Sequence, residues 1–132
     1  MNEKTIKYWI EAAKYDLETA RAMLETKRYL YVGFMCHQCI EKFLKGYYVS
    51  VKNEVPPYIH NLLSLSEKSN LYNYFSEEQK DLLNELQPLN IEARYPKYKD
   101  ELFKSLSEER CEQILKRAEE LSKWIIKKLM IN

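Results

Sequence analysis

Apolar residues recur at alternating steps of four and three along the first part of the chain. This spacing places them on one side of an α-helix, while lysines, glutamates and an arginine fall on the other side. The apolar stripe consists of Ile6, Ile10, Ala13, Leu17, Ala20 and Leu24, widened by Trp9 and Met23. The pattern predicts a long helix over residues 5–26.

Two further long helices are predicted. One runs from about Tyr29 to Lys52 and stops before Pro56 and Pro57, which impose extended backbone; its beginning, YLYVGF, is strand-prone in isolation. The other begins after Ser107 as N-cap, with two glutamates in its first turn. Its apolar stripe is Cys111, Ile114, Ala118, Leu121, Ile125 and Leu129.

Shorter helices fill part of the middle of the chain. Residues 60–69 predict one short helix, with Leu62, Leu63 and Leu65 facing inward. Ser76, followed three residues later by Gln79, has the capping-box pattern and opens another. That helix is expected to end near residue 86, because Pro88 disfavours helix at the residue before it. We expect residues 88–106 to form a loop.

These elements predict an all-α protein, an up-down bundle of three long and two short helices in a single domain, residues 1–132. The composition agrees, because two glycines and four prolines are too few for a turn-rich β architecture. Hydrophobic residues make up 45% of the chain, which is typical of globular proteins.

Charge and cysteine content narrow the functional classes. Twenty-one basic and twenty acidic residues leave a net charge of +1, so no overall field draws the protein to nucleic acid or to an anionic membrane. No apolar run approaches the roughly 20 residues of a bilayer span, and no signal-peptide core is present. Three cysteines do not form a disulfide framework. We expect a cytoplasmic protein without a membrane partner.

The segment CHQC, residues 36–39, resembles a fragment of a metal or redox site. On a helical wheel, however, Cys36 falls in the same sector as Ile40, Phe43 and Tyr47, with Cys39 at its edge. A zinc site would need two more ligands from Cys111, His37 and His60, and no second paired motif exists. Core packing of both cysteines is therefore favoured over the metal and redox alternatives, and no metal ligands are assigned.

The opposite sector of the same helix combines aromatic and polar residues. Such a surface is typical of a protein interface or a ligand groove. The interface candidates are Tyr31, Phe34, Met35, Gln38, Glu41 and Tyr48, with Lys42 and Lys45 beside them. The alternative is that the short helices cover this face within one chain.

The segment EARYPKYK, residues 92–99, alternates basic residues with tyrosines. Arg94 could bind a phosphate through paired hydrogen bonds, and Tyr95 offers a flat face to a base. A solvated structural loop is an equal alternative, as is a pairing of Arg94 with Glu41 or with a helix end. His60, at the expected beginning of a short helix, could cap that helix or contact a ligand.

Several segments together resemble one protein family over nearly the whole chain. They are W-x3-A-x2-D-L (Trp9, Ala13, Asp16, Leu17), CHQCIEKFLKGYY, PPYIHNLLSL and LNIEARYPKY. This order resembles the HEPN family, the higher-eukaryote and prokaryote nucleotide-binding domain. The resemblance implies an up-down bundle, frequent homodimers, and pairing with a minimal nucleotidyltransferase in toxin–antitoxin modules. In many such pairs the helical member is a ribonuclease.

The ribonuclease members carry an arginine followed, after four to six residues, by a histidine. Neither Arg94 nor Arg110 has such a histidine, and Arg28 precedes His37 by too many residues. No catalytic residue is therefore assigned. The positions that match recurrent motifs of the family are His37, Gln38, Glu41, Lys42, Lys45, His60, Arg94 and Tyr95.

The leading hypothesis is a non-catalytic binding module without a cofactor. It would form a homodimer or pair with a nucleotidyltransferase, and bind a nucleotide or RNA end. The ligand-binding candidates are Arg94, Tyr95, Lys42, Lys45 and His60. Two alternatives stay open: a divergent ribonuclease toxin that uses His60 or His37 with Arg94, and a purely structural adaptor.

Overall fold

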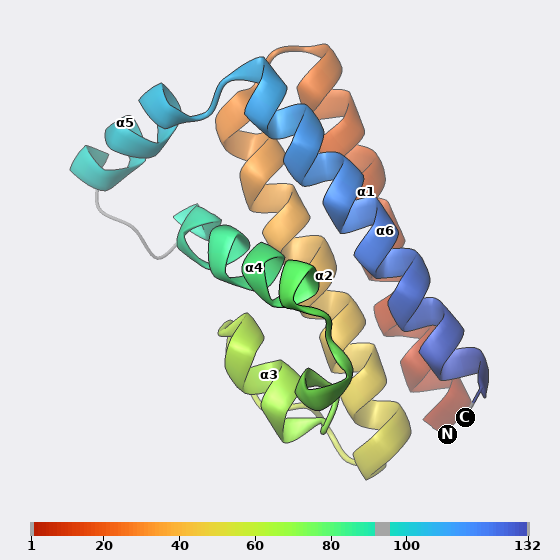
Figure 1. Cartoon of the computed structure of the whole chain (residues 1–132). Coiled ribbons are helices and arrows are strands. Elements are labelled where there is room, and N and C mark those ends of the chain that lie inside the picture. Colours follow the sequence, from red (N-terminus) through yellow and green to blue (C-terminus); the bar gives the residue numbers. More distant parts are fainter. Residues whose placement is uncertain (1, 92–95, 132) are drawn as a thin grey trace.

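The computed structural model describes residues 2–91 and 96–131, and every regular element within them is helical (Figure 1). The α-helices are α1 (Asn2–Glu25), α2 (Tyr29–Lys52), α3 (Leu62–Lys68), α4 (Glu77–Leu86), α5 (Pro96–Ser105) and α6 (Glu108–Ile131). Two single 3-10 turns, η1 (Tyr72–Tyr74) and η2 (Gln87–Leu89), flank α4. The prediction of an all-α fold is confirmed.

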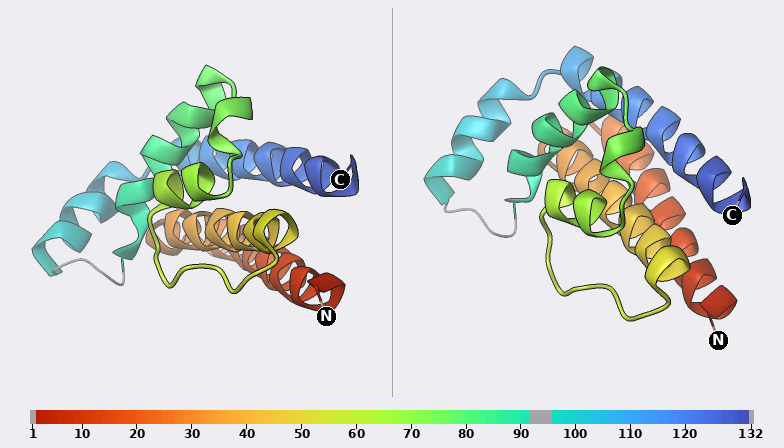
Figure 2. Two further views of the ribbon diagram at one scale, coloured as in Figure 1. Left: turned by 90° about the horizontal axis from the view of Figure 1, so that it is seen from below. Right: turned by 60° about the horizontal axis from the view of Figure 1, so that its bottom comes forward.

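The three long helices lie side by side, with α2 in the centre. A short turn reverses the chain between α1 and α2, and α6 runs alongside both (Figure 1). Helices α3 and α4 lie on the side of α2 that faces away from α1, so α2 is covered on several sides (Figure 2). The chain therefore begins and ends at the same end of the bundle, where α2 also ends (Figure 1).

The core is built around the apolar sector of α2. Cys36, Cys39, Ile40, Phe43 and Leu44 are all fully buried there. Burial raises the pKa of the Cys39 thiol to about 12, and it also raises the pKa of Cys36. A buried thiol with a raised pKa stays protonated and acts as a small apolar side chain. The prediction that these cysteines pack in the core is confirmed.

Polar side chains cap the helices where the sequence predicts it. The Ser76 and Gln79 side chains each accept a hydrogen bond from the other residue's backbone N–H, which completes the capping box of α4. Ser107 Oγ accepts from the N–H of Arg110 at the beginning of α6. For α3 the N-cap is Asn61 rather than His60, and Asn61 Oδ1 accepts from the N–H of Ser64. These bonds satisfy N–H groups that have no partner inside the helix.

Two expectations for the middle of the chain are wrong. Residues 88–106 are not a loop throughout, because α5 occupies residues 96–105 and buries Leu102. Proline suits the first turn of a helix, so Pro96 begins this helix rather than preventing it. In addition, Leu63 is 38% exposed instead of facing inward, while Leu62 and Leu65 are buried.

A glycine permits the close packing of α1 against α2. A β-carbon at Gly46 would lie 3.2 Å from both Trp9 Cβ and Ile10 Cδ1. Contacts at that distance are tighter than ordinary van der Waals separations. The lack of a side chain at this position therefore sets how near α1 approaches the C-terminal half of α2.

The outer faces of the long helices are charged. Lys7 and Glu11 pair at 3.8 Å along α1, and Arg21 pairs with Glu119 of α6 at 3.2 Å. In the part of the chain that the structure describes, no helix is both long and apolar enough to cross a bilayer.

Candidate functional site

A carboxylate on the polar side of α2 organises a buried cluster of ionisable groups. Glu41 is only 4% exposed, and its oxygens accept hydrogen bonds from two sides. Lys45, one turn later on α2, donates from Nζ to Oε2 at 3.1 Å. His60 comes from the segment between α2 and α3, and its Nδ1 lies 3.0 Å from Oε2 and 3.1 Å from Oε1. The cluster therefore joins α2 to the chain that leads into α3.

Lys45 is enclosed rather than available to a ligand. It is 6% exposed, and its Nζ lies 5.6 Å from the centre of the Trp9 ring and 5.8 Å from that of Tyr58. Two aromatic faces and one carboxylate thus compensate its charge in a site with little water. A phosphate would have to displace Glu41 to reach this ammonium group.

His60 is the accessible member of the cluster. Its side chain is 53% exposed, while Glu41 holds the Nδ1 nitrogen. The Tyr58 ring lies edge-on at 6.1 Å between ring centres. Among the described residues, nothing hydrogen-bonds the opposite nitrogen, Nε2. An imidazole fixed at one nitrogen and accessible at the other can bind a ligand or transfer a proton.

His37 lies inside the fold on the same side of α2. It is completely buried, with Nδ1 3.2 Å from Gln38 Oε1 and 3.9 Å from Glu41 Oε1. Its Nε2 has no hydrogen-bond partner among the described residues. Burial lowers the pKa of His37, and the nearby Glu41 carboxylate only partly opposes this. The ring is therefore favoured in its neutral form at neutral pH.

Lys42 is engaged in an ion pair between helices. Its Nζ donates to Asp16 Oδ2 of α1, and Asp16 is buried. This pair explains why an aspartate lies on the apolar side of α1, where the family-like segment W-x3-A-x2-D-L contains it. Both lysines that the sequence suggested as ligand contacts, Lys42 and Lys45, therefore already have a carboxylate partner.

The six interface candidates divide by exposure. Phe34, Glu41 and Tyr48 are buried within the chain, and Met35 and Gln38 are half-buried. Only Tyr31 is well exposed, at 49%. The alternative that the chain covers this face itself thus holds for three of the six positions. An interface on α2 remains a prediction for its N-terminal half.

Arg94 and Tyr95 lie outside the described residues. Their predicted roles, including the pairing of Arg94 with Glu41, therefore stay predictions. What the sequence did not reveal is the enclosure of Lys45 by Trp9 and Tyr58. The sequence feature that could have suggested this enclosure is the position of Trp9, which lies at the edge of the apolar stripe of α1 rather than in its middle.

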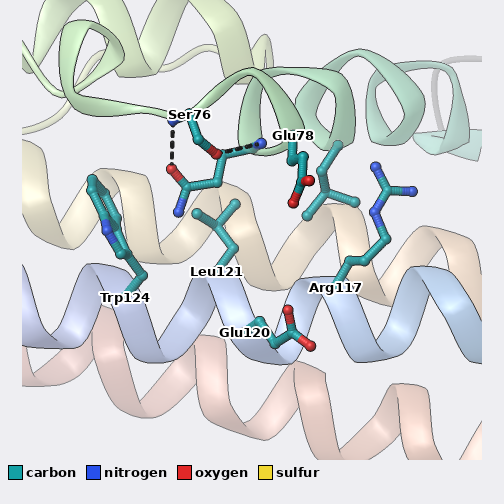
Figure 3. A pocket seen from close by; sticks show the side chains of 8 residues that line it. Ser76, Glu78, Arg117, Glu120, Leu121 and Trp124 are labelled. Atoms are coloured by element: carbon teal, nitrogen blue, oxygen red, sulfur yellow. Dashed lines mark hydrogen bonds between the residues drawn. The ribbon is translucent and has the colours of Figure 1, made fainter.

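A separate groove lies between α4 and α6. Its volume is about 280 Å³, and its walls include Glu78, Glu120, Arg117 and Trp124. Figure 3 shows Arg117 and Trp124 extending from α6 on either side of Leu121, toward α4. Arg117 is already paired with Glu85, so its charge is compensated. This groove combines a neutralised arginine with two acidic walls and does not suit a phosphate.

Comparisons with known proteins agree on one fold. The model of the HEPN domain family matches residues 6–129. The crystal structure of TT1696 from Thermus thermophilus superposes with a TM-score of 0.80 at 22% identity, covering 97% of this chain and 99% of that chain. ST0689, described as an archaeal HEPN homologue, gives 0.66 at 21% identity, covering 94% and 97%. No curated protein matches the sequence.

Proposed function

This chain belongs to the HEPN domain family, and on that premise we propose that it is a non-catalytic binding module of the cytoplasm. It forms a homodimer or pairs with a minimal nucleotidyltransferase in a toxin–antitoxin-type module, and it binds a nucleotide or an RNA end. The three free thiols support a reducing compartment. The family supports the partner class, and the Glu41 cluster supports the binding role.

The observation that carries the proposal is the arrangement of charges around Glu41. Lys45 and His60 both contact this buried carboxylate, so the cluster fixes side chains instead of leaving several reactive groups exposed. His60 alone offers a half-exposed ring to a ligand. We assign the ligand contact to His60, with Arg94 and Tyr95 added on sequence grounds. Lys42 and Lys45 then position the site through their ion pairs.

Calorimetric titration with ATP tests the nucleotide part. The wild-type protein is expected to bind saturably, and Arg94→Ala to lose at least about tenfold in affinity, because a charge-assisted phosphate contact is worth roughly 1.5–3 kcal/mol. His60→Asn should weaken binding less. Arg28→Ala, which removes an exposed arginine at the beginning of α2, is the control and should bind normally.

The outcomes separate the two parts of the proposal. If the wild-type protein gives no binding heat with ATP, nucleotide binding is contradicted and protein association is left as the function. A monodisperse monomer that ignores nucleotides and also fails to bind a minimal nucleotidyltransferase encoded beside it would overturn the whole proposal.

A divergent ribonuclease is the second candidate, favoured by the pairing of His60 with Glu41. A carboxylate 3.0 Å from Nδ1 orients an imidazole in the way that a general base requires. If the protein cleaves RNA, His60→Ala should lower the rate by about 100-fold or more. Cleavage that persists in both His60→Ala and His37→Ala would exclude this assignment.

A further inference from the structure

A second pocket lies at the end of the bundle where α1 begins and α2 ends, and it shares Trp9 with the enclosure of Lys45. Its volume is about 560 Å³, within the usual range for small-molecule sites. Tyr8 and Trp9 of α1 form an aromatic wall, with their ring centres 5.6 Å apart. Val49 of α2 and the residues after α2, including Val55 and Pro56, form the rest of the apolar surface.

The charge that lines this pocket is negative. Glu54 is the only charged residue among those that line it. Tyr48 donates its hydroxyl to Glu54 Oε1 at 2.7 Å, which fixes the carboxylate, and no described residue hydrogen-bonds Oε2. Asn2 also lines the pocket, and its Oδ1 is buried, with no hydrogen-bond partner among the described residues.

Lys45 lies beside the pocket, but it cannot neutralise the charge of Glu54. Lys45 lies over the Trp9 ring, but its ammonium group is bonded to Glu41 and is almost entirely enclosed. The pocket thus combines aromatic and aliphatic walls with a carboxylate that forms no ion pair among the described residues. This combination disfavours an anion such as a nucleotide and favours a cation that also carries an apolar group.

We propose that this pocket, lined by Trp9, Val49 and Glu54, binds a small primary amine that bears one aromatic or branched aliphatic group. The ammonium group donates to Glu54 Oε2, and the apolar group lies against Trp9 and Val49. This site differs from the nucleotide site proposed above, because His60 is not among its lining residues and it takes a ligand of opposite charge.

Trp9 itself can report on binding. The chain has two tryptophans, and Trp124→Phe leaves Trp9 as the single fluorophore. In this background we expect phenethylamine to produce a saturable change in emission, with a dissociation constant on the order of millimolar for so small a ligand. Phenylpropionate, which replaces the ammonium group by a carboxylate, should produce no saturable change.

Two matched variants test the role of the charge. Glu54→Gln keeps an acceptor for Tyr48 but removes the negative charge, and should raise the dissociation constant for phenethylamine about tenfold. Glu120→Gln removes an equivalent charge from the groove between α4 and α6 (Figure 3) and should leave it unchanged. Circular dichroism checks that both variants retain the helical signal of the parent.

Three results would overturn the assignment of an amine ligand to this pocket. It fails if phenethylamine gives no saturable response, if phenylpropionate binds as tightly, or if Glu54→Gln binds with unchanged affinity. Methyl chemical shifts of Val49 and Val55 provide a second measurement that does not depend on fluorescence. They should move on titration in the parent, and shifts confined to residues elsewhere would also refute the site.

Discussion

Glu41 shows how one buried residue can hold several parts of this protein together. The helical wheel places Glu41 and Lys45 one turn apart on the same side of α2, so their pairing follows from the sequence. The contact with His60 does not, because it depends on how the chain between α2 and α3 returns to this helix. The residue's partners therefore come partly from local and partly from tertiary structure.

Removing the Glu41 carboxylate should destabilise the fold. Glu41→Ala leaves Lys45 enclosed without its partner, and loss of one member of a buried ion pair costs about 3–5 kcal/mol. Urea denaturation followed by circular dichroism measures this loss. Combining Glu41→Leu with Lys45→Met should recover much of the stability, because no unpaired charge then remains. A loss below about 1 kcal/mol in Glu41→Ala would contradict a structural role for this pair.

His37 should make stability depend on pH. Because burial lowers its pKa in the folded state, the unfolded chain takes up a proton at higher pH than the folded chain does. The contribution of His37 is thus fully present above its unfolded pKa of about 6.5 and is lost as pH falls below it, at up to about 1.4 kcal/mol per pH unit. Denaturation between about pH 7.5 and about pH 5.5, roughly one unit on either side of that pKa, should show this fall.

The variant His37→Asn supplies the control for this pH dependence. It removes the titrating ring, so its free energy of unfolding should fall less steeply over the same interval. His60→Asn, which changes the accessible histidine instead, should keep the steeper slope of the wild type. Equal slopes in His37→Asn and the wild type would assign the effect to another group.

At the scale of elements, the two glycines of α2 show different constraints. A β-carbon at Gly46 would press on the Cβ of Trp9, which sits close to the backbone of α1. At Gly33 it would meet Leu89 Cδ1 at 3.0 Å, and that methyl group is the end of a flexible side chain. The first contact can be relieved only by separating two helices, whereas the second can be relieved by a side-chain rotation.

We therefore expect Gly46→Val to destabilise the protein by about 1–3 kcal/mol, the usual cost of forcing extra volume into a packed interface. Gly33→Ala should change stability by less than about 1 kcal/mol, because alanine's better helix propensity offsets the small displacement. Thermal denaturation of both variants compares them directly. If Gly46→Val proves as stable as the wild type, close packing of α1 on α2 does not depend on this residue.

The element that sequence reasoning missed, α5, has an identifiable physical cause. Pro96 looks like a helix breaker when it is considered alone, yet it has the fixed φ that the first turn of a helix needs. The signal that could have identified α5 is weak, since Leu102 is its only described buried residue. Short helices depend on tertiary packing more than on their own periodicity.

At the scale of the whole molecule, the proposed homodimer can be tested at Tyr31. This tyrosine is the well-exposed member of the interface candidates. If α2 forms the interface through its N-terminal half, Tyr31→Lys should weaken dimerisation by about 30-fold or more, as expected for an aromatic anchor worth roughly 2 kcal/mol. Analytical ultracentrifugation over a range of concentrations measures the effect.

Tyr15→Lys is the matched control for this test. Tyr15 is an exposed tyrosine on α1 and has no assigned role in association. Its replacement should leave the dimerisation constant unchanged. Equal weakening by both substitutions, or a wild-type protein that stays monomeric throughout, would contradict an interface at Tyr31.

The sequence by itself determined the three long helices, the caps of α4 and α6, and the apolar sector that buries Cys36 and Cys39. These features are local, because side-chain periodicity and capping depend on residues within a few turns of one another. Only the tertiary structure decided that Lys45 is enclosed by Trp9 and Tyr58, that Lys42 pairs with Asp16, and that His60 reaches Glu41. Those contacts join residues that are distant along the chain, and their formation depends on how helices pack and loops return.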